Sequence, residues 1–99
     1  MRLNNSYKLL FSFVLKSDSM SKAEKILIRI LSQPKDFSFT ELKSLLSSFG
    51  YVEEQGAGSR VCFKSKTHKI KLHKPHPGNI LKQYQLSLII DELRKEGLI

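Results

Sequence analysis

Cysteine is scarce in this chain: Cys62 is the single one, so no disulfide can form within the chain. Small extracellular domains commonly depend on several disulfides, and the lack of them favours the cytoplasm.

Long apolar runs are scarce too. The apolar stretch 9–15 is interrupted by Ser12 and is far shorter than the roughly 20 residues of a membrane-spanning helix. Because Lys16 and Asp18 follow it in place of small residues, it makes a poor secretory signal. We therefore expect a cytoplasmic protein that has no membrane partner.

Acidic residues are missing from a long central part of the chain. Between Gln55 and Ile90 there is neither Asp nor Glu, although all three histidines fall there. The basic residues of this segment are Arg60, Lys64, Lys66, Lys69, Lys71, Lys74 and Lys82. Ordinary surfaces intersperse both signs, and the whole chain carries a net charge of +8, so this segment favours binding to nucleic-acid phosphates. The same charge would also suit an acidic protein, an anionic lipid or a merely solvated strand face.

Helix signals are present in three places. Ser21 and Ser38 each begin a serine–glutamate capping box, which opens an amphipathic helix. In the first helix the apolar stripe leaves Lys22, Lys25 and Arg29 to face away from the core. A third apolar stripe lies near the end of the chain and stops at a glycine. We expect helices over 21–31, 38–49 and 83–96.

Strand signals fill the middle of the chain, where apolar and polar residues alternate. We expect strands over 51–55, 60–64 and 69–73, followed by a rigid proline-containing loop over 75–79. The fold class is therefore α+β: a three-stranded antiparallel sheet with the last two helices packed on one face, and an extra N-terminal helix. At 99 residues there is room for one domain, which we place at 20–99, with 1–19 as an N-terminal extension.

The uncovered sheet face is the candidate binding surface, because strand alternation assigns Arg60, Lys64, Lys69, Lys71 and His73 to it. No aromatic residue shares this face, so recognition of the RNA backbone and its shape is favoured over base stacking. No helix-turn-helix or zinc signature points to major-groove DNA reading. The residues that we expect to bind RNA are Ser59, Arg60, Lys64, Lys69, Lys71 and Lys74.

The histidines suggest acid–base chemistry more than metal binding. No Cys or His pair has the spacing of a structural zinc site, and no carboxylate lies nearby in the sequence, so we expect no metal. Cleaving RNA through its own 2′-OH needs a base, an acid and a cation for the developing charge, and histidine titrates near neutrality. We assign proton transfer first to His73 and second to His76, with Arg60 stabilising the phosphate charge. His68 is expected to be a solvated histidine in a turn.

Four segments together resemble one protein family. They are 49–51 at the end of a helix, the glycine-rich turn and strand 58–63, the loop 73–79, and the helix end 96–98. Over roughly 37–99 the chain is similar to HicA-type toxins. The resemblance implies a fold like the double-stranded-RNA-binding domain, ribosome-independent mRNA cleavage without a metal cofactor, and neutralisation by an acidic HicB-type antitoxin.

The chain departs from the family pattern at one position. In the family a catalytic histidine follows the Gly-Ser pair, whereas here Arg60 follows Gly58 and Ser59. Arginine stays protonated at neutral pH and cannot act as a base. We therefore keep two functions open: a type II endoribonuclease toxin with a rearranged site, or a non-catalytic RNA-binding module on the same fold.

Overall fold

The computed structural model describes residues 21–99, and the expected extension over 1–19 lies outside this range. Its elements follow the order α2 (Lys22–Leu31), α3 (Phe39–Ser48), β1 (Val52–Gln55), β2 (Arg60–Lys64), β3 (Lys69–His73) and α4 (Gln83–Lys95). The expected α+β class is thus confirmed, and each element lies within three residues of its expected bounds. No helix within 21–99 is long and apolar enough to cross a membrane.

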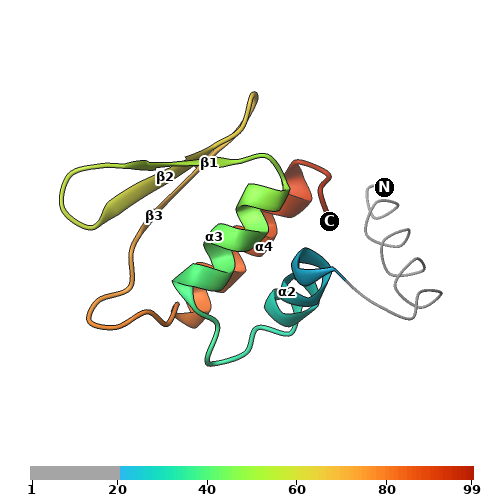
Figure 1. Cartoon of the computed structure of the whole chain (residues 1–99), viewed down its shortest axis with the longest axis horizontal. Helices are drawn as coiled ribbons and strands as arrows, with labels where there is room; N and C mark the ends of the chain where they lie inside the picture. Colours follow the sequence, from blue (N-terminus) through green and yellow to red (C-terminus); the bar gives the residue numbers. More distant parts are fainter. Residues whose placement is uncertain (1–20) are drawn as a thin grey trace.

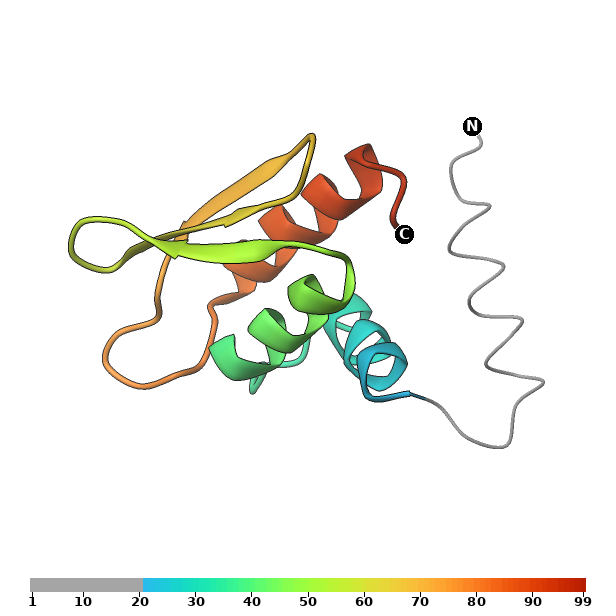
Figure 2. The same cartoon turned by 45° about the horizontal axis from the view of Figure 1, so that its top comes forward.

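The molecule has three layers, as Figures 1 and 2 show. The sheet has the order β1-β2-β3 and is antiparallel throughout. Helices α3 and α4 cover one of its faces, with α3 contacting β1 and α4 contacting β3. Helix α2 packs against α3 and α4 on the side away from the sheet. The other face of the sheet is therefore left without a helix.

The core lies between the sheet and the two helices that cover it. Alternate residues of β2 and β3 point inward: Val61, Phe63, Ile70 and Leu72 are all buried. Two leucine- and isoleucine-rich stripes meet them from α3 and α4. These stripes consist of Leu42, Leu45, Leu46, Leu86, Ile89, Ile90 and Leu93. Because the inward residues take one side of each strand, their polar neighbours are placed on the uncovered face.

Both expected capping boxes are present. The backbone N–H of Glu24 donates to Ser21 Oγ at 3.1 Å, and that of Glu41 donates to Ser38 Oγ at 3.0 Å. One detail of α2 differs from expectation: Arg29 does not face away from the protein. Its Nε donates to Glu41 Oε2 at 2.7 Å, so the guanidinium joins α2 to the start of α3. Helical spacing alone could not show this partner, because Glu41 belongs to another element.

The loop after β3 is held against the segment before α3. The N–H of Phe39 donates to the Asn79 carbonyl at 2.7 Å, and the N–H of Leu81 donates to the Phe37 carbonyl at 2.9 Å. At the other end of the loop, the N–H of Lys74 donates to the Ser59 carbonyl at 2.8 Å. These backbone bonds bring three segments distant in sequence to one corner of the molecule, beside the end of the sheet.

Candidate nucleic-acid interface

Arg60 and His73 are direct partners across β2 and β3. Their side chains share the uncovered face and both are exposed. Directly opposed residues have Cβ atoms about 5 Å apart, so one phosphodiester can contact both side chains. The structure therefore places side by side the two residues that the sequence assigned to charge stabilisation and proton transfer. Lys71 extends the same face, opposite Cys62.

Ser59 orients the imidazole of His73. Its Oγ lies 3.2 Å from His73 Nδ1, so this ring nitrogen is in a hydrogen bond with Ser59. Within 21–99 no hydrogen bond engages Nε2, so that atom can exchange a proton with a ligand. Ser59 reaches this place because Gly58 adopts φ +61°, a left-handed conformation that suits glycine in a tight turn.

Gln85 supports His73 from the opposite side of the sheet and was missed by sequence reasoning. It is 5% exposed, and its Nε2 donates to the His73 carbonyl at 2.9 Å. Its Oε1 accepts from the backbone N–H of Lys82 at 3.0 Å. A buried amide with both ends bonded fixes the backbone to which it binds. The one available signal was a glutamine beside the apolar stripe of α4, which does not reveal its partner.

At the end of the sheet away from Arg60 and His73, one of the expected RNA-binding lysines forms a salt bridge within the protein. Lys64 lies opposite Lys69, and its Nζ is 3.1 Å from Glu54 Oε1. Glu54 pairs in register with Cys62, so β1 brings a carboxylate onto the basic face. The segment without acids therefore does not produce a face without acids. Lys69 and Lys71 are exposed, and neither forms a salt bridge within 21–99.

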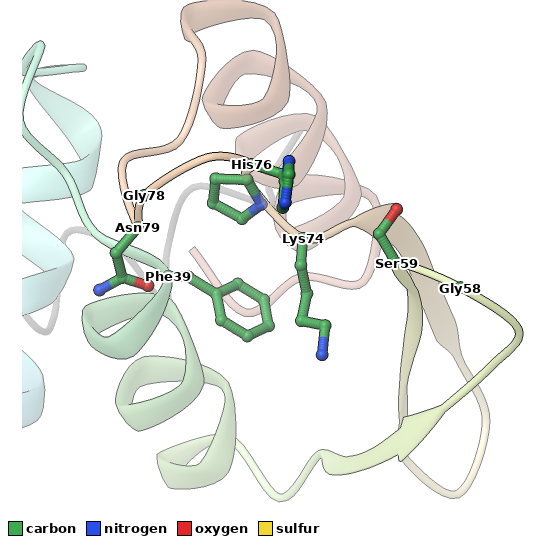
Figure 3. Close-up of a pocket in the computed structure, with 8 residues that line it drawn as sticks. Phe39, Gly58, Ser59, Lys74, His76, Gly78 and Asn79 are labelled. Atoms are coloured by element: carbon green, nitrogen blue, oxygen red, sulfur yellow. The ribbon is translucent and has the colours of Figure 1, made fainter.

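A groove beside the sheet is lined by three residues of the expected site: Ser59, Lys74 and His76. Phe39, Pro75 and Asn79 line it as well, and Figure 3 shows Phe39 and Asn79 on one side of the groove. Lys74 Nζ donates to Gln55 Oε1 at 3.0 Å, which holds the amine at the edge of the sheet. The expected residues thus occupy two adjoining places: Arg60 and His73 on the face, and Lys74 and His76 in the groove. Ser59 lies between the two places, because it lines the groove and also contacts His73.

His68 is not the solvated turn histidine that the sequence suggested. Its side chain is 12% exposed and is held at both ring nitrogens. Nδ1 lies 2.6 Å from the Tyr51 hydroxyl, and Nε2 lies 2.7 Å from Glu92 Oε1. The hydrogen bond from His68 lowers the pKa of Glu92, which favours the charged carboxylate. His68 therefore fastens the sheet to α4 and stays out of the candidate site.

No group of three His, Cys, Asp or Glu residues within 21–99 is arranged to hold a metal ion. Cys62 lies half-buried on the uncovered sheet face, between Arg60 and Lys64 of β2. The side chains available for chemistry at this face are therefore imidazole, guanidinium, ammonium and hydroxyl groups. Such a set can bind a phosphodiester and move protons around it.

The fold and the site define a class: a small α+β domain whose open sheet face presents cations and an oriented histidine. The comparison with protein families gives this class a name, since the family model for the HicA toxin of bacterial toxin–antitoxin systems matches residues 39–95. The chain belongs to the HicA toxin family. The match begins at the first residue of α3, so α2 precedes it. Neither a curated protein nor a solved structure matches the chain.

Proposed function

We propose that this protein is the toxin of a type II toxin–antitoxin system and that it binds and cleaves mRNA in the cytoplasm. Membership of the HicA family supports the toxin role and implies an antitoxin partner. The observation that carries the catalytic part is the cross-strand pair of Arg60 and His73 on the uncovered basic face. This pair supplies the base and the cation that cleavage through the 2′-OH requires, without a metal.

In this mechanism Nε2 of His73 takes the proton from a 2′-OH while the 2′ oxygen attacks the adjacent phosphorus. Arg60 donates hydrogen bonds to the non-bridging oxygens, whose charge rises as the new P–O bond forms. The bond from phosphorus to the 5′ oxygen breaks, and protonated His76 gives that oxygen its proton. The products carry a 2′,3′-cyclic phosphate and a 5′-hydroxyl. Ser59 keeps the imidazole of His73 turned toward the phosphate.

The antitoxin in this proposal is an acidic HicB-like protein that covers the same face. An uncovered surface with Arg60, Lys69 and Lys71 exposed would attract RNA of any sequence. Acidic side chains on the partner match this charge, speed association and fix the orientation of the complex. Antitoxin and RNA should therefore compete. An antitoxin that binds together with RNA, without displacing it, would contradict this arrangement.

A non-catalytic RNA-binding module is the second candidate, and the observation that favours it is Arg60 itself. In the family the residue after the Gly-Ser pair is the active histidine, and arginine cannot take its role as a base. Every phosphate contact of the basic face would remain in such a module. The two candidates differ in one property: only the first depends on His73 and His76 for an effect on RNA integrity.

The test is induced expression in bacterial cells with and without the antitoxin, following growth and mRNA integrity. We expect wild-type protein to arrest growth and fragment mRNA, and the antitoxin to reverse both. The double variant His73→Ala, His76→Ala should be harmless at equal protein level. A matched control is Lys22→Ala, an exposed cation on α2 away from the sheet, which should remain toxic. Full toxicity of the double histidine variant would overturn the catalytic assignment.

A further inference from the structure

The groove beside the sheet differs in chemistry from the sheet face. It has a volume of about 680 Å³ and is lined by Phe39, Gly58, Ser59, Lys74, Pro75, His76, Gly78 and Asn79. This size lies within the range of small-molecule sites. No acidic residue lines it, and two apolar rings, Phe39 and Pro75, are among its lining residues. Figure 3 shows the Phe39 ring between the side chains of Asn79 and Lys74. The uncovered sheet face, in contrast, carries no aromatic residue on its three strands.

The largely buried Phe39 ring forms part of the groove wall, and the chain is fixed around it. Its ring packs against Phe63 at 6.0 Å between centroids and is 6% exposed, so its position is set by the core. Asn79 is fixed as well: its Nδ2 donates to Thr40 Oγ1 at 3.1 Å, which leaves Oδ1 free to accept a hydrogen bond. In Figure 3 that oxygen lies on the side of the Phe39 ring. Rigid walls of this kind preorganise a site.

The groove adjoins the proposed cleavage site through a shared residue. Ser59 lines the groove, and its hydroxyl contacts His73. Lys74 and His76 continue the chain directly after His73 and line the groove as well. A nucleotide whose phosphate lies between Arg60 and His73 therefore has its neighbouring base within reach of the groove.

We propose that this groove holds one unpaired base of the RNA, next to the phosphate that is cleaved. The inference rests on the proposed function and adds a substrate class to it: RNA that is single-stranded at the cleavage point. A flat, partly apolar base suits a site with an aromatic ring, a proline ring and neutral hydrogen-bonding groups, whereas a second phosphate would need mainly cations and amide donors. Lys74 and His76 line the groove as well, so their side chains can contact the base and also complement the negative charge of the flanking phosphates.

The experiment removes single bases while keeping every phosphate. A single-stranded oligonucleotide with 2′-O-methyl groups, which prevent cleavage, is prepared with one abasic position moved along its length. For wild-type protein we expect one position to lower the affinity about 5- to 150-fold, the range for loss of one stacked base, and the other positions to have little effect. A uniform response at all positions would overturn this inference while leaving RNA binding intact.

Two groove variants and one control locate the effect. Asn79→Ala and Lys74→Met should each reduce the position-specific loss to less than threefold. Lys66→Met removes an exposed cation from the turn between β2 and β3, outside the groove, and should keep the full loss. If both groove variants keep the full loss of RNA affinity at that abasic position, the inference is overturned. It is also overturned if these variants weaken the binding of the antitoxin but not of RNA. Absence of any RNA binding by wild-type protein would overturn the proposed function together with this inference.

Discussion

Gln85 of α4 is hydrogen-bonded to His73 at the end of β3: its buried side-chain amide donates to the His73 carbonyl at 2.9 Å. Helix α4 thus fixes the end of the strand that carries the proposed base. Gln85→Leu should lower the free energy of unfolding by about 1 to 3 kcal/mol, since the carbonyl and the Lys82 N–H lose their partner. As Gln85 positions His73, kcat for RNA cleavage should fall while RNA affinity stays within about twofold. Tyr84→Phe, an exposed change on the same helix, is the control. Equal loss of affinity and kcat would contradict a positioning role.

Arg60 should contribute to both RNA binding and cleavage. Arg60→Ala removes the guanidinium that faces the phosphate, and we expect weaker binding together with a loss in kcat of about 100-fold or more, as for other transition-state charge donors. Arg60→Lys keeps the charge but loses the planar fork, so it should restore binding more than kcat. Single-turnover cleavage and equilibrium binding separate these effects. A normal cleavage rate in Arg60→Ala would remove this residue from the mechanism.

Lys69 and Lys71 should bind RNA by charge alone. In a plot of log K against log salt concentration, each phosphate contact contributes about 0.7 to 0.9 to the slope. The double variant Lys69→Ala, Lys71→Ala should therefore flatten the slope by about 1.4 to 1.8 and weaken binding to all sequences alike. The matched control, Lys22→Ala with Lys25→Ala, removes the same charge from exposed positions of α2. If both pairs change the slope equally, the sheet face is not the binding surface.

The bond between His68 and Glu92 should make stability depend on pH on the acid side. The hydrogen bond from His68, with Lys95 nearby, lowers the pKa of Glu92 in the folded state below its ordinary value of 4.5. The unfolded chain then binds a proton more readily, so this stabilisation is present above about pH 4.5 and is lost as pH falls through the lowered pKa. Glu92→Gln should cost about 1 to 2 kcal/mol near pH 6 and progressively less toward pH 3.

Urea unfolding between pH 3 and 7 measures this difference. Asp91→Asn, an exposed neutralisation on the same helix, is the control and should cost less than about 0.5 kcal/mol at every pH. A cost for Glu92→Gln that does not change with pH would show that the charge of Glu92 is not the source of the stabilisation.

Local patterns predicted the elements of this fold because each depends on neighbouring residues. The serine–glutamate boxes at Ser21 and Ser38 place two helix starts, and strand alternation places Arg60 and His73 on one face. The family was also recognisable from short segments of the sequence, and the match to 39–95 confirms it.

Contacts between distant elements could not be predicted in this way. Glu54 reaches Lys64 only through the register of β1 against β2, and a shift of one residue would turn it to the other face. Phe39 meets the loop after β3 because of backbone bonds across 40 residues of chain. The partners of His68 and Gln85 likewise lie on elements far away in sequence. The groove and the supports of the site therefore emerge only in three dimensions.

The most direct test of this account is cleavage of single-stranded RNA by purified protein in the presence of a metal chelator. We expect wild-type protein to cut the RNA and leave a 2′,3′-cyclic phosphate, and to leave a strand with a 2′-deoxy nucleotide at the cut position intact. His73→Ala should bind the RNA with an affinity within about threefold of wild type and cut it at least about 100-fold more slowly, the size of a general-base contribution. Cleavage by His73→Ala at the wild-type rate, or no cleavage by wild-type protein under any of these conditions, would contradict the central claim.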